Sequence, residues 1–299
     1  MKKLLVVLLA VAMIFAFAAC AQEPNQPDTS ATDTEETDVT YTVGMLTMNN
    51  LTEEQAFEIA EYFSGYEAGP GFHVIFYNDI STAVLALKSG EIDQLSRLPK
   101  CTAEYIAARN DGMEIKDTMS RDDAACYNKY AMAVMEENAA LGDELSVAIK
   151  AMQDDGTLEQ LIADYLTAYV AAGDDPAAVE MPVIEGADTV KVAITGCLPP
   201  LDFIAANGTP AGFNVAFLAE LSNRIGKNIE LVTVDSGSRS IALASGKVDA
   251  VFWNAVCDVT DDIDAELTGG TKLSQIDVPE GVVLTDFYFT DARATLLMK

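Results

Sequence analysis

The sequence predicts an α/β fold of two similar lobes with mainly parallel sheets around a cleft. Residues 86–93 (Ala-Leu-Lys-Ser-Gly-Glu-Ile-Asp) return in altered form as residues 242–249 (Ala-Leu-Ala-Ser-Gly-Lys-Val-Asp). Each copy lies between two apolar runs, a pattern typical of strand, amphipathic helix and strand. Such segments alternate along most of the chain, which favours parallel sheets with right-handed crossovers. Since ligands bind beyond the carboxyl ends of parallel strands, two facing lobes predict a ligand between them.

Local signals place the individual elements. Thr52 and Gln55 form a capping box that opens a helix ending near Phe63. Gly90 and Gly246 each follow a helix, because glycine adopts the left-handed conformation that ends a helix without a Cβ clash. The other expected strands are 42–46, 73–77, 92–96, 129–135, 190–195 and 295–298, the other helices are 80–88, 102–109, 144–152, 158–169 and 215–224, and a strand–helix–strand unit covers 229–252.

The N-terminus has the pattern of an export signal. A basic start and an apolar run at 4–17 precede Phe-Ala-Ala-Cys, which ends at Cys20 and resembles a bacterial lipobox, with phenylalanine where leucine is more usual. The resemblance implies a signal peptide at 1–19 and a lipid on the thiol of Cys20; a plain secretory signal is the alternative. Residues 20–40 are almost free of apolar side chains and are expected to form a flexible tether. We therefore expect an extracytoplasmic protein anchored to the cell membrane through Cys20.

The charge of the chain excludes one class of partner. It contains 47 acidic and 18 basic residues, which gives a formal net charge of −29, and no cluster of basic residues interrupts this surplus. An acidic surface repels phosphate backbones and anionic lipid headgroups. Nucleic-acid binding is therefore excluded.

Four cysteines follow Cys20, and their spacing matches no metal-binding pattern, so no bound metal is expected. An even number of cysteines in an exported protein permits two disulfides. The pairs Cys101–Cys126 and Cys197–Cys257 would each stay within one lobe. Unpaired thiols packed in the core are the alternative.

The sequence offers no catalytic constellation. His73, the single histidine, lies on an apolar strand, where a packed side chain is commoner than a base. Ser238 and Ser240 have no histidine in their segment to activate them. We therefore expect neither an enzyme nor a bound cofactor.

Several motifs resemble family 3 of the bacterial extracellular solute-binding proteins, the amino-acid-type receptors of ABC importers. Those of the second half are 192–203 (Val-Ala-Ile-Thr-Gly-Cys-Leu-Pro-Pro-Leu-Asp-Phe), 207–215 (Asn-Gly-Thr-Pro-Ala-Gly-Phe-Asn-Val) and 243–249 (Leu-Ala-Ser-Gly-Lys-Val-Asp). Residues 286–290 resemble the family's first hinge strand, 130–134 and 148–158 its closing section, and 91–105 its second lobe. The resemblance implies two Rossmann-like lobes around a cleft, as in type II periplasmic binding proteins.

The order of these pieces is reversed relative to the family, which predicts a circular permutation at the hinge. Two truncated receptors in tandem are the alternative. Permutation is tolerated where the termini lie close together, so Lys299 is expected to end near Thr42. The expected segments are lobe two at 41–128, a hinge strand and helices packing on lobe one at 129–170, a linker at 171–187, and lobe one at 188–299.

Ten residues at strand ends or on the loops that follow are candidates for ligand binding. In lobe two they are Thr47, Asn49, Asn50, Arg97 and Lys100, the last two on the loop expected after the strand at 92–96; in lobe one they are Leu198, Ser236, Arg239, Trp253 and Asn254.

Each of the more specific candidates has a structural alternative. Arg239 binds an anion or caps its helix, and Trp253 stacks on a ligand or packs in the core. Asn49 and Asn50 bind a carboxylate at a helix N-terminus or form a turn.

The chain departs from the family's ligand chemistry. Leu198 and Ser236 stand where the family usually has aromatic residues, and Leu98 stands where it has the aspartate for an α-ammonium group. The family's carboxylate-binding arginine has no counterpart in 258–264. These differences argue against an ordinary α-amino acid as the ligand.

We expect a monomeric, lipid-anchored receptor that delivers a small polar solute, amino-acid-like or another carboxylate, to an ABC permease in the membrane. Two alternatives remain. A receptor-fold enzyme such as a dehydratase would need a carboxylate or the histidine deep in the cleft. A surface sensor or interaction lipoprotein would have an empty, apolar or collapsed cleft, whereas convergent Arg239, Trp253 and Asn50 would favour transport.

Overall fold

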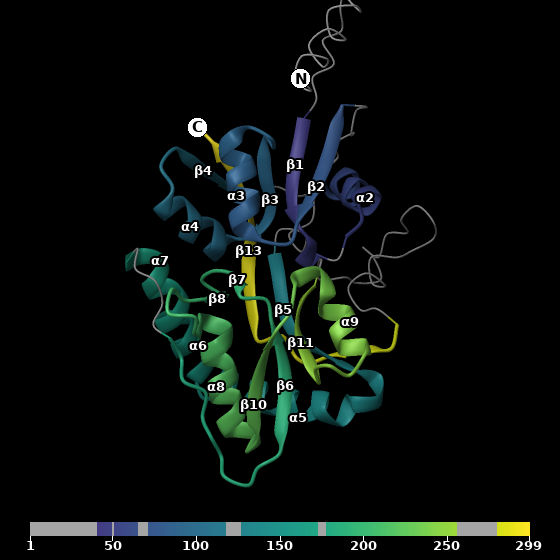
Figure 1. Ribbon diagram of the computed structural model, residues 1–299, viewed down its shortest axis with the longest axis vertical. Coiled ribbons are helices and arrows are strands. Elements are labelled where there is room, and N and C mark those ends of the chain that lie inside the picture. The colour runs from purple at the N-terminus through teal and green to yellow at the C-terminus, as the bar shows by residue number, and fades with distance from the viewer. Residues whose placement is uncertain (1–40, 50, 65–70, 118–126, 173–177, 256–279) are drawn as a thin grey trace, which may run out of the picture. The chain divides into compact units, whose positions relative to one another are not determined.

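Two groups of parallel strands flank a pair of long antiparallel strands in one ten-stranded sheet (Figure 1). The computed structural model describes residues 41–49, 51–64, 71–117, 127–172, 178–255 and 280–299. The main path of the sheet runs β10-β6-β11-β5-β13-β3-β1-β2, with β12 paired to β5 and β4 to β13. Residues Val39–Lys299 pack as one unit. The mixed α/β fold class is confirmed.

The first group of strands, which we call lobe two, has β1 at its centre. This strand pairs in parallel with β2 and β3, because the helices that follow β1 and β2 return the chain for each next strand. Its elements are β1 (Tyr41–Leu46), η1 (Thr47–Asn49), α2 (Glu53–Ser64), β2 (Phe72–Tyr77), α3 (Ile80–Ser89), β3 (Gln94–Pro99), α4 (Lys100–Arg109) and β4 (Met113–Asp117).

The second group, lobe one, repeats this design around β6, which pairs in parallel with β10 and β11. Its elements are β6 (Thr189–Ile194), α8 (Phe213–Ile225), β10 (Asn228–Thr233), η5 (Ser236–Ser238), α9 (Arg239–Ala244) and β11 (Ala250–Ala255), with a separate sheet of β7 (Cys197–Leu198), β8 (Asp202–Ile204) and β9 (Pro210–Ala211).

Strands β5 (Tyr127–Met135) and β13 (Phe289–Met298) join the two lobes. One end of β13 pairs antiparallel with β5, and the other end pairs antiparallel with β3 and β4. Strand β5 also pairs with β11 and with β12 (Val282–Leu284). A ten-residue strand spans about 33 Å, which is long enough to run from one lobe into the other.

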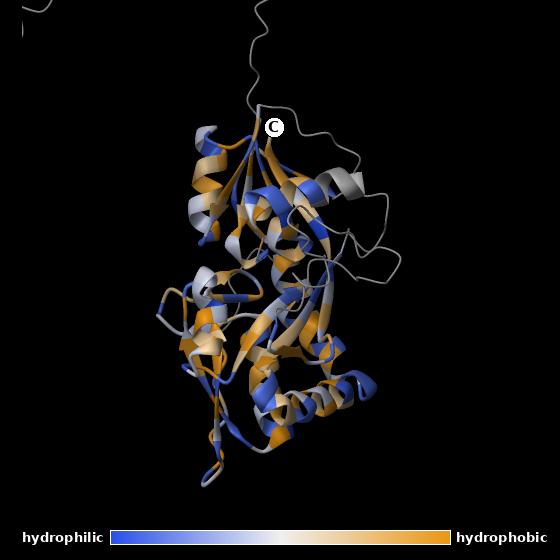
Figure 2. Cartoon of the chain, turned by 90° about the vertical axis from the view of Figure 1, so that its right-hand side faces the viewer, coloured by the Kyte–Doolittle hydropathy of each residue, from blue (hydrophilic) through white to orange (hydrophobic). Residues whose placement is uncertain are grey.

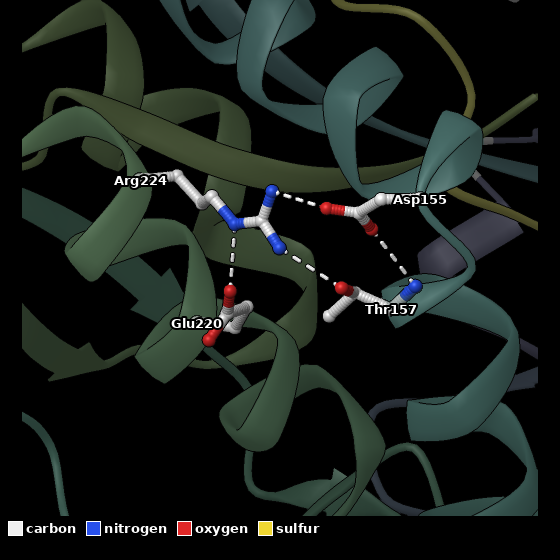
Figure 3. A network of polar contacts seen from close by, with 4 residues as sticks. All are labelled: Asp155, Thr157, Glu220 and Arg224. Carbon is white, nitrogen blue, oxygen red and sulfur yellow. Dashed lines mark hydrogen bonds and ion pairs between the residues drawn. The ribbon is translucent and has the colours of Figure 1, made fainter.

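A helical segment between β5 and β6 packs on α8. It consists of η3 (Glu136–Asn138), α5 (Ala139–Asp154), α6 (Thr157–Ile162), η4 (Ala163–Thr167) and α7 (Ala168–Ala172), and its expected break falls at Gly156, where φ is 79°. Figure 3 shows the polar contacts that hold the segment to α8. Arg224 of α8 contacts Glu220 and Asp155 at 2.7 Å each and donates to Thr157 at 2.9 Å. Hydrogen bonds from Thr157 and from Arg224 lower the pKa of Asp155 to about 2.

The local signals of the sequence act as expected. Thr52 Oγ1 accepts from the amide of Gln55 and the Gln55 side chain accepts from the amide of Thr52, which is the reciprocal pattern of a capping box. Gly90 ends α3 with φ 76°, and Gly246 follows α9 with φ 68°. Strands β4, β7, β8, β9 and β12 were not anticipated, because most are short and depend on their partner strands rather than on a periodic pattern.

Apolar residues concentrate on the strands and on the inner sides of the helices, as the hydropathy colours of Figure 2 show. A continuous buried cluster includes Leu95 and Leu296 in lobe two and Val192 and Phe217 in lobe one. The two lobes thus share one core through the joining strands. Within the described residues no helix has both the length and the apolar character needed to cross a membrane. The lobe boundaries given above stay predictions.

Candidate functional site

The carboxyl ends of β1, β2, β6 and β10 meet, and three side chains bridge the two lobes there. Thr47, directly after β1, lies 2.8 Å from Ser236, which follows β10 (Oγ1 to Oγ). Thr47 Oγ1 also lies 2.8 Å from Oδ1 of Asn78, and Ser236 Oγ donates to the carbonyl of Asn78 at 2.9 Å. Because each hydroxyl carries one proton, only two of these three contacts can be hydrogen bonds at one time. Two of the predicted residues, one from each lobe, are therefore brought together.

Arg239 is buried at the start of α9 and is only 3% exposed. Its guanidinium donates to three backbone carbonyls, those of Ser236 (3.0 Å), Phe252 (2.9 Å) and Met48 (2.9 Å). The last of these comes from lobe two. Burial lowers the pKa of Arg239, and the charge of Asp202 opposes this effect. Arg239 thus joins the two lobes through buried hydrogen bonds. This role comes in addition to the two alternatives expected for it, an anion site and a helix cap.

Asn254 and Asn49 form a further contact between the lobes. Both are at least 95% buried, and Asn254 Nδ2 donates to Asn49 Oδ1 at 3.3 Å. Within the described part of the chain, the Oδ1 atom of Asn254 has no hydrogen-bond partner. An unpaired buried amide oxygen costs about 1–3 kcal/mol, so it marks a position where a ligand or a water can bind.

These residues surround a small cavity. Its volume is about 20 Å³, which is room for one or two water molecules, since one water needs about 10–15 Å³. Tyr130 of β5 also lines it, and the buried hydroxyl of this residue has no hydrogen-bond partner among the described residues. The lining residues are Met48, Tyr130, Thr195, Leu198, Asp202, Asn214, Arg239, Phe252, Trp253 and Asn254.

Asp202 is the carboxylate of the cavity wall, and it is 3% exposed. It accepts hydrogen bonds from the hydroxyl of Thr195 (2.7 Å) and the amide of Gly196 (2.7 Å). Burial raises its pKa, against the effect of these donors. Both oxygens face the loop between β6 and β7, because Thr195 donates to the second oxygen through its amide as well (3.4 Å).

Trp253 and Leu198 line the cavity and are also part of the core. Trp253 is 1% exposed and packs with Val234, Leu243 and Val251, and Leu198 is 3% exposed. The guanidinium carbon of Arg239 lies 5.8 Å from the centre of the Trp253 ring. The core position expected as one alternative for Trp253 is confirmed, and stacking on a ligand stays a prediction.

The expected loop position of Arg97 and Lys100 is wrong. Residues 89–93 form the left-handed turn that ends α3, in which the amides of Gly90 and Glu91 bond back to the helix, so β3 begins only at Gln94. Arg97 thus lies within β3, with φ 58°, and Lys100 opens α4. Neither lines the cavity, and Lys100 pairs with Asp117 at 2.8 Å.

The structure describes His73 and two of the cysteines, but not Asn50 or the remaining cysteines. His73 is exposed on β2 rather than packed, because β2 is the outer strand of the sheet. Cys101 and Cys197 are free cysteines. Asn50, Cys20 and the proposed disulfide partners Cys126 and Cys257 lie outside the described residues. In the described part of the chain, no group of three or more metal-binding side chains occurs.

Sequence reasoning missed six of the lining residues: Met48, Tyr130, Thr195, Asp202, Asn214 and Phe252. One signal was available for Asp202. A carboxylate directly between Leu201 and Phe203 in an apolar segment is expected to be buried, and a buried carboxylate needs a hydrogen-bond or charge partner. Tyr130 had no such signal, because an alternating strand of this composition is equally typical of plain core.

Comparison with known proteins identifies one segment. Residues 190–257 match bacterial extracellular solute-binding proteins, family 3, which confirms the resemblance of the motifs in that range. No curated protein matches the chain.

The solved structures that match the chain have low sequence identity to it. One is a ligand-binding component of an ABC-type import system from Staphylococcus aureus with zinc bound (9% identity, TM-score 0.41, 87% of this chain and 66% of that one). Another is the periplasmic aliphatic sulphonate binding protein SsuA from Escherichia coli (10% identity, TM-score 0.35, 87% and 65%). A third is an ancestral arginine-binding protein bound to arginine (14% identity, TM-score 0.37, 87% and 84%). The chain spans just under two thirds of the length of the first two.

Proposed function

We propose that this chain is a lipid-anchored extracytoplasmic receptor that holds a small polar solute between its two lobes and delivers it to an ABC permease. One observation carries the proposal: side chains and carbonyls that follow strands of both lobes converge on one small cavity, at which Asn254 Oδ1 has no hydrogen-bond partner among the described residues. The match of residues 190–257 to a solute-binding family supports it.

Such a receptor works by a shift between open and closed states. A solute that touches both lobes only when they are closed selects the closed state. The contact between Thr47 and Ser236 and the bond from Arg239 to Met48 hold the two lobes together. Solute must therefore enter from an open state in which these contacts are broken.

The two alternatives each have one observation in their favour. Asp202 is the buried carboxylate that an enzyme in this fold would need, but Thr195 and Gly196 already occupy its oxygens. The small volume of the cavity agrees with a sensor whose cleft has lost its ligand. The convergence of polar groups on the cavity favours transport, although Asn50 lies outside the described residues.

We propose further that the chain is one circularly permuted receptor. Leu297 pairs with Gln94, which pairs with Val43, so the last strand lies two strand spacings, about 10 Å, from the first. Two tandem halves would not require β13 to pair with strands of both lobes. A variant that joins Lys299 to Tyr41 by a short linker and opens the chain within 171–187 should fold and melt cooperatively. An unfolded product with intact expression would contradict the permutation.

The proposed function is tested by screening the full-length chain in a thermal-shift assay against amino acids, small peptides, organic acids and sugars. A solute at 100 times its dissociation constant stabilises the folded state by about 2.7 kcal/mol. Small-angle X-ray scattering with and without the solute should then show a population shift toward the closed form. If no class of solute binds, transport is wrong and the sensor alternative gains.

Lipid anchoring needs a separate test. Cells that express the chain with a labelled fatty acid should incorporate the label into it, and the Cys20→Ser variant should not. Label in both proteins, or in neither, would contradict anchoring at Cys20.

A further inference from the structure

The strand-to-helix loops of the two lobes contact each other. Asn78 directly follows β2 in lobe two, and Ser236 lies just after β10 in lobe one. Each loop is held in shape by an aspartate that caps the next helix. Asp79 accepts from two amides in the first turn of α3 (2.8 and 3.0 Å), and Asp235 accepts from one amide of η5 (2.9 Å). Contacts between these loops therefore join two preformed surfaces.

Four residues, which we call the latch, make these contacts: Thr47, Asn78, Cys197 and Ser236. Ser236 Oγ donates to the carbonyl of Asn78 at 2.9 Å and lies 2.8 Å from Thr47 Oγ1. The thiol of Cys197 donates to the same carbonyl at 3.5 Å. Burial raises the pKa of Cys197 to about 11, so the thiol keeps its proton at pH 7 and remains a donor. Two donors of lobe one thus converge on one carbonyl of lobe two.

The latch adjoins the cavity in both lobes. Met48, which follows Thr47 in η1, and Leu198, which follows Cys197 in β7, both line the cavity. The volume of about 20 Å³ holds one or two waters, so a larger solute enters only when the two walls move apart. Because each wall is continuous with a latch residue, that movement separates Thr47 and Cys197 from their partners in the other lobe.

We propose that the latch opposes solute binding. The lobes that it joins admit no solute larger than a pair of water molecules, and a solute binds only after the latch has broken. The inference rests on the proposed function, because it concerns the regulation of the same site. When only a fraction of a protein can bind, the apparent affinity falls by that fraction. Weakening the latch should therefore strengthen solute binding, whereas contacts that persist around a bound solute would have the opposite effect.

Trp253 reports the separation of the lobes without a solute. It is the single tryptophan of the sequence, it is 1% exposed, and it lines the cavity. Acrylamide is an uncharged quencher of tryptophan fluorescence that acts by collision. It therefore reaches Trp253 only when the lobes separate, and the bimolecular quenching constant of the full-length chain rises with the open fraction.

A pair of variants tests the latch with this probe. Ser236→Ala removes both contacts of the Ser236 hydroxyl. Ser96→Ala is the matched control, because Ser96 Oγ lies 3.1 Å from Thr295 Oγ1 in a hydroxyl pair between β3 and β13. One hydrogen bond changes a two-state equilibrium by about two- to tenfold. Ser236→Ala should raise the quenching constant of Trp253 by this factor over the parent protein, and the control should leave it unchanged.

Equal quenching constants for the two variants would overturn the latch. If Ser236→Ala does not fold, Thr47→Val removes the partner hydroxyl and should change the quenching constant in the same direction. A quenching constant of Thr47→Val equal to that of the parent protein would then overturn it.

The direction of the change in affinity decides whether the latch competes with a solute. An amino acid, peptide, organic acid or sugar that the thermal-shift screen identifies should bind Ser236→Ala about two- to tenfold more tightly than it binds the parent protein or Ser96→Ala. Equal or weaker binding to Ser236→Ala would overturn the inference and leave the receptor function standing. If quenching rises as expected and no solute of any class binds, the latch stands and the receptor function is wrong.

Discussion

Replacing Arg239 by methionine tests whether this side chain stabilises the folded protein by joining the two lobes. Methionine has a similar length but donates no hydrogen bonds. The variant leaves the carbonyls of Ser236, Phe252 and Met48 without their guanidinium donor, and it leaves Asp202 without a nearby cation. Each unpaired buried acceptor costs about 1–3 kcal/mol, and removing one member of a buried charge pair costs about 3–5 kcal/mol. Because these costs overlap, we expect Arg239→Met to lower the free energy of unfolding by about 3–5 kcal/mol.

Arg224→Met is the matched control, because Arg224 also contacts three side chains (Figure 3). Its side chain is 27% exposed, so water replaces the lost partners and the expected cost is about 1 kcal/mol or less. Urea unfolding followed by circular dichroism gives both values. A loss below about 1 kcal/mol for Arg239→Met, equal to that of the control, would refute the structural role. Arg239 would then be a surplus cation available to an anionic solute.

A double variant measures how much of the loss in the free energy of unfolding comes from the charge of Asp202 that has lost its cation. Adding Asp202→Asn to Arg239→Met removes the carboxylate that has lost its cation, and it should recover about 1 kcal/mol. No recovery would show that the unpaired carbonyls account for the whole effect.

Three further perturbations have defined outcomes. Thr47→Val and Ser236→Ala, combined in a double-mutant cycle, should give a coupling of about 0.5–1.5 kcal/mol in urea unfolding, and additive losses would contradict a direct bond between lobes. The pKa of Asp155 is lowered to about 2, so the charged carboxylate stabilises the folded state above its ordinary pKa of 3.8, and this stabilisation is lost as the pH falls through about 2. In the Asp155→Asn variant, the free energy of unfolding should therefore vary less with pH in that range. An unchanged pH dependence of the free energy of unfolding would contradict this contribution of Asp155. Gly90→Ala and Gly246→Ala should each cost about 1 kcal/mol, because alanine is strained at positive φ, and thermal melting that matches the parent protein would contradict this.

The secondary structure followed closely from the sequence, because its signals are local. The capping box at Thr52 and the glycines at 90 and 246 set helix boundaries within a few residues of themselves. Strand β3 shows the limit of such reasoning. The apolar Ile92 suggested an earlier start, but the turn that ends α3 uses residues up to Ile92 in hydrogen bonds back to the helix.

The candidate site was predicted in part. Strand ends identified Thr47, Ser236, Arg239 and Asn254, since the carboxyl ends of parallel strands meet at one edge. Arg97 and Lys100 were assigned to the cleft through the same misplaced strand, and they lie in β3 and α4 instead. Tyr130 could not be found, because its position in the cavity depends on the pairing of β5 with both β11 and β13.

By itself, the sequence indicated most of the helices and the longer strands, the repeat of residues 86–93 in residues 242–249, and a strongly acidic net charge. Only the tertiary structure decided that Arg239 binds the carbonyl of Met48, 191 positions away, and that Thr47 meets Ser236. The physical reason is the separation along the sequence over which each kind of interaction acts. Helix caps and strand periodicity act between residues a few positions apart, whereas the contents of a cleft depend on contacts between distant segments whose geometry is fixed only when the whole sheet has formed.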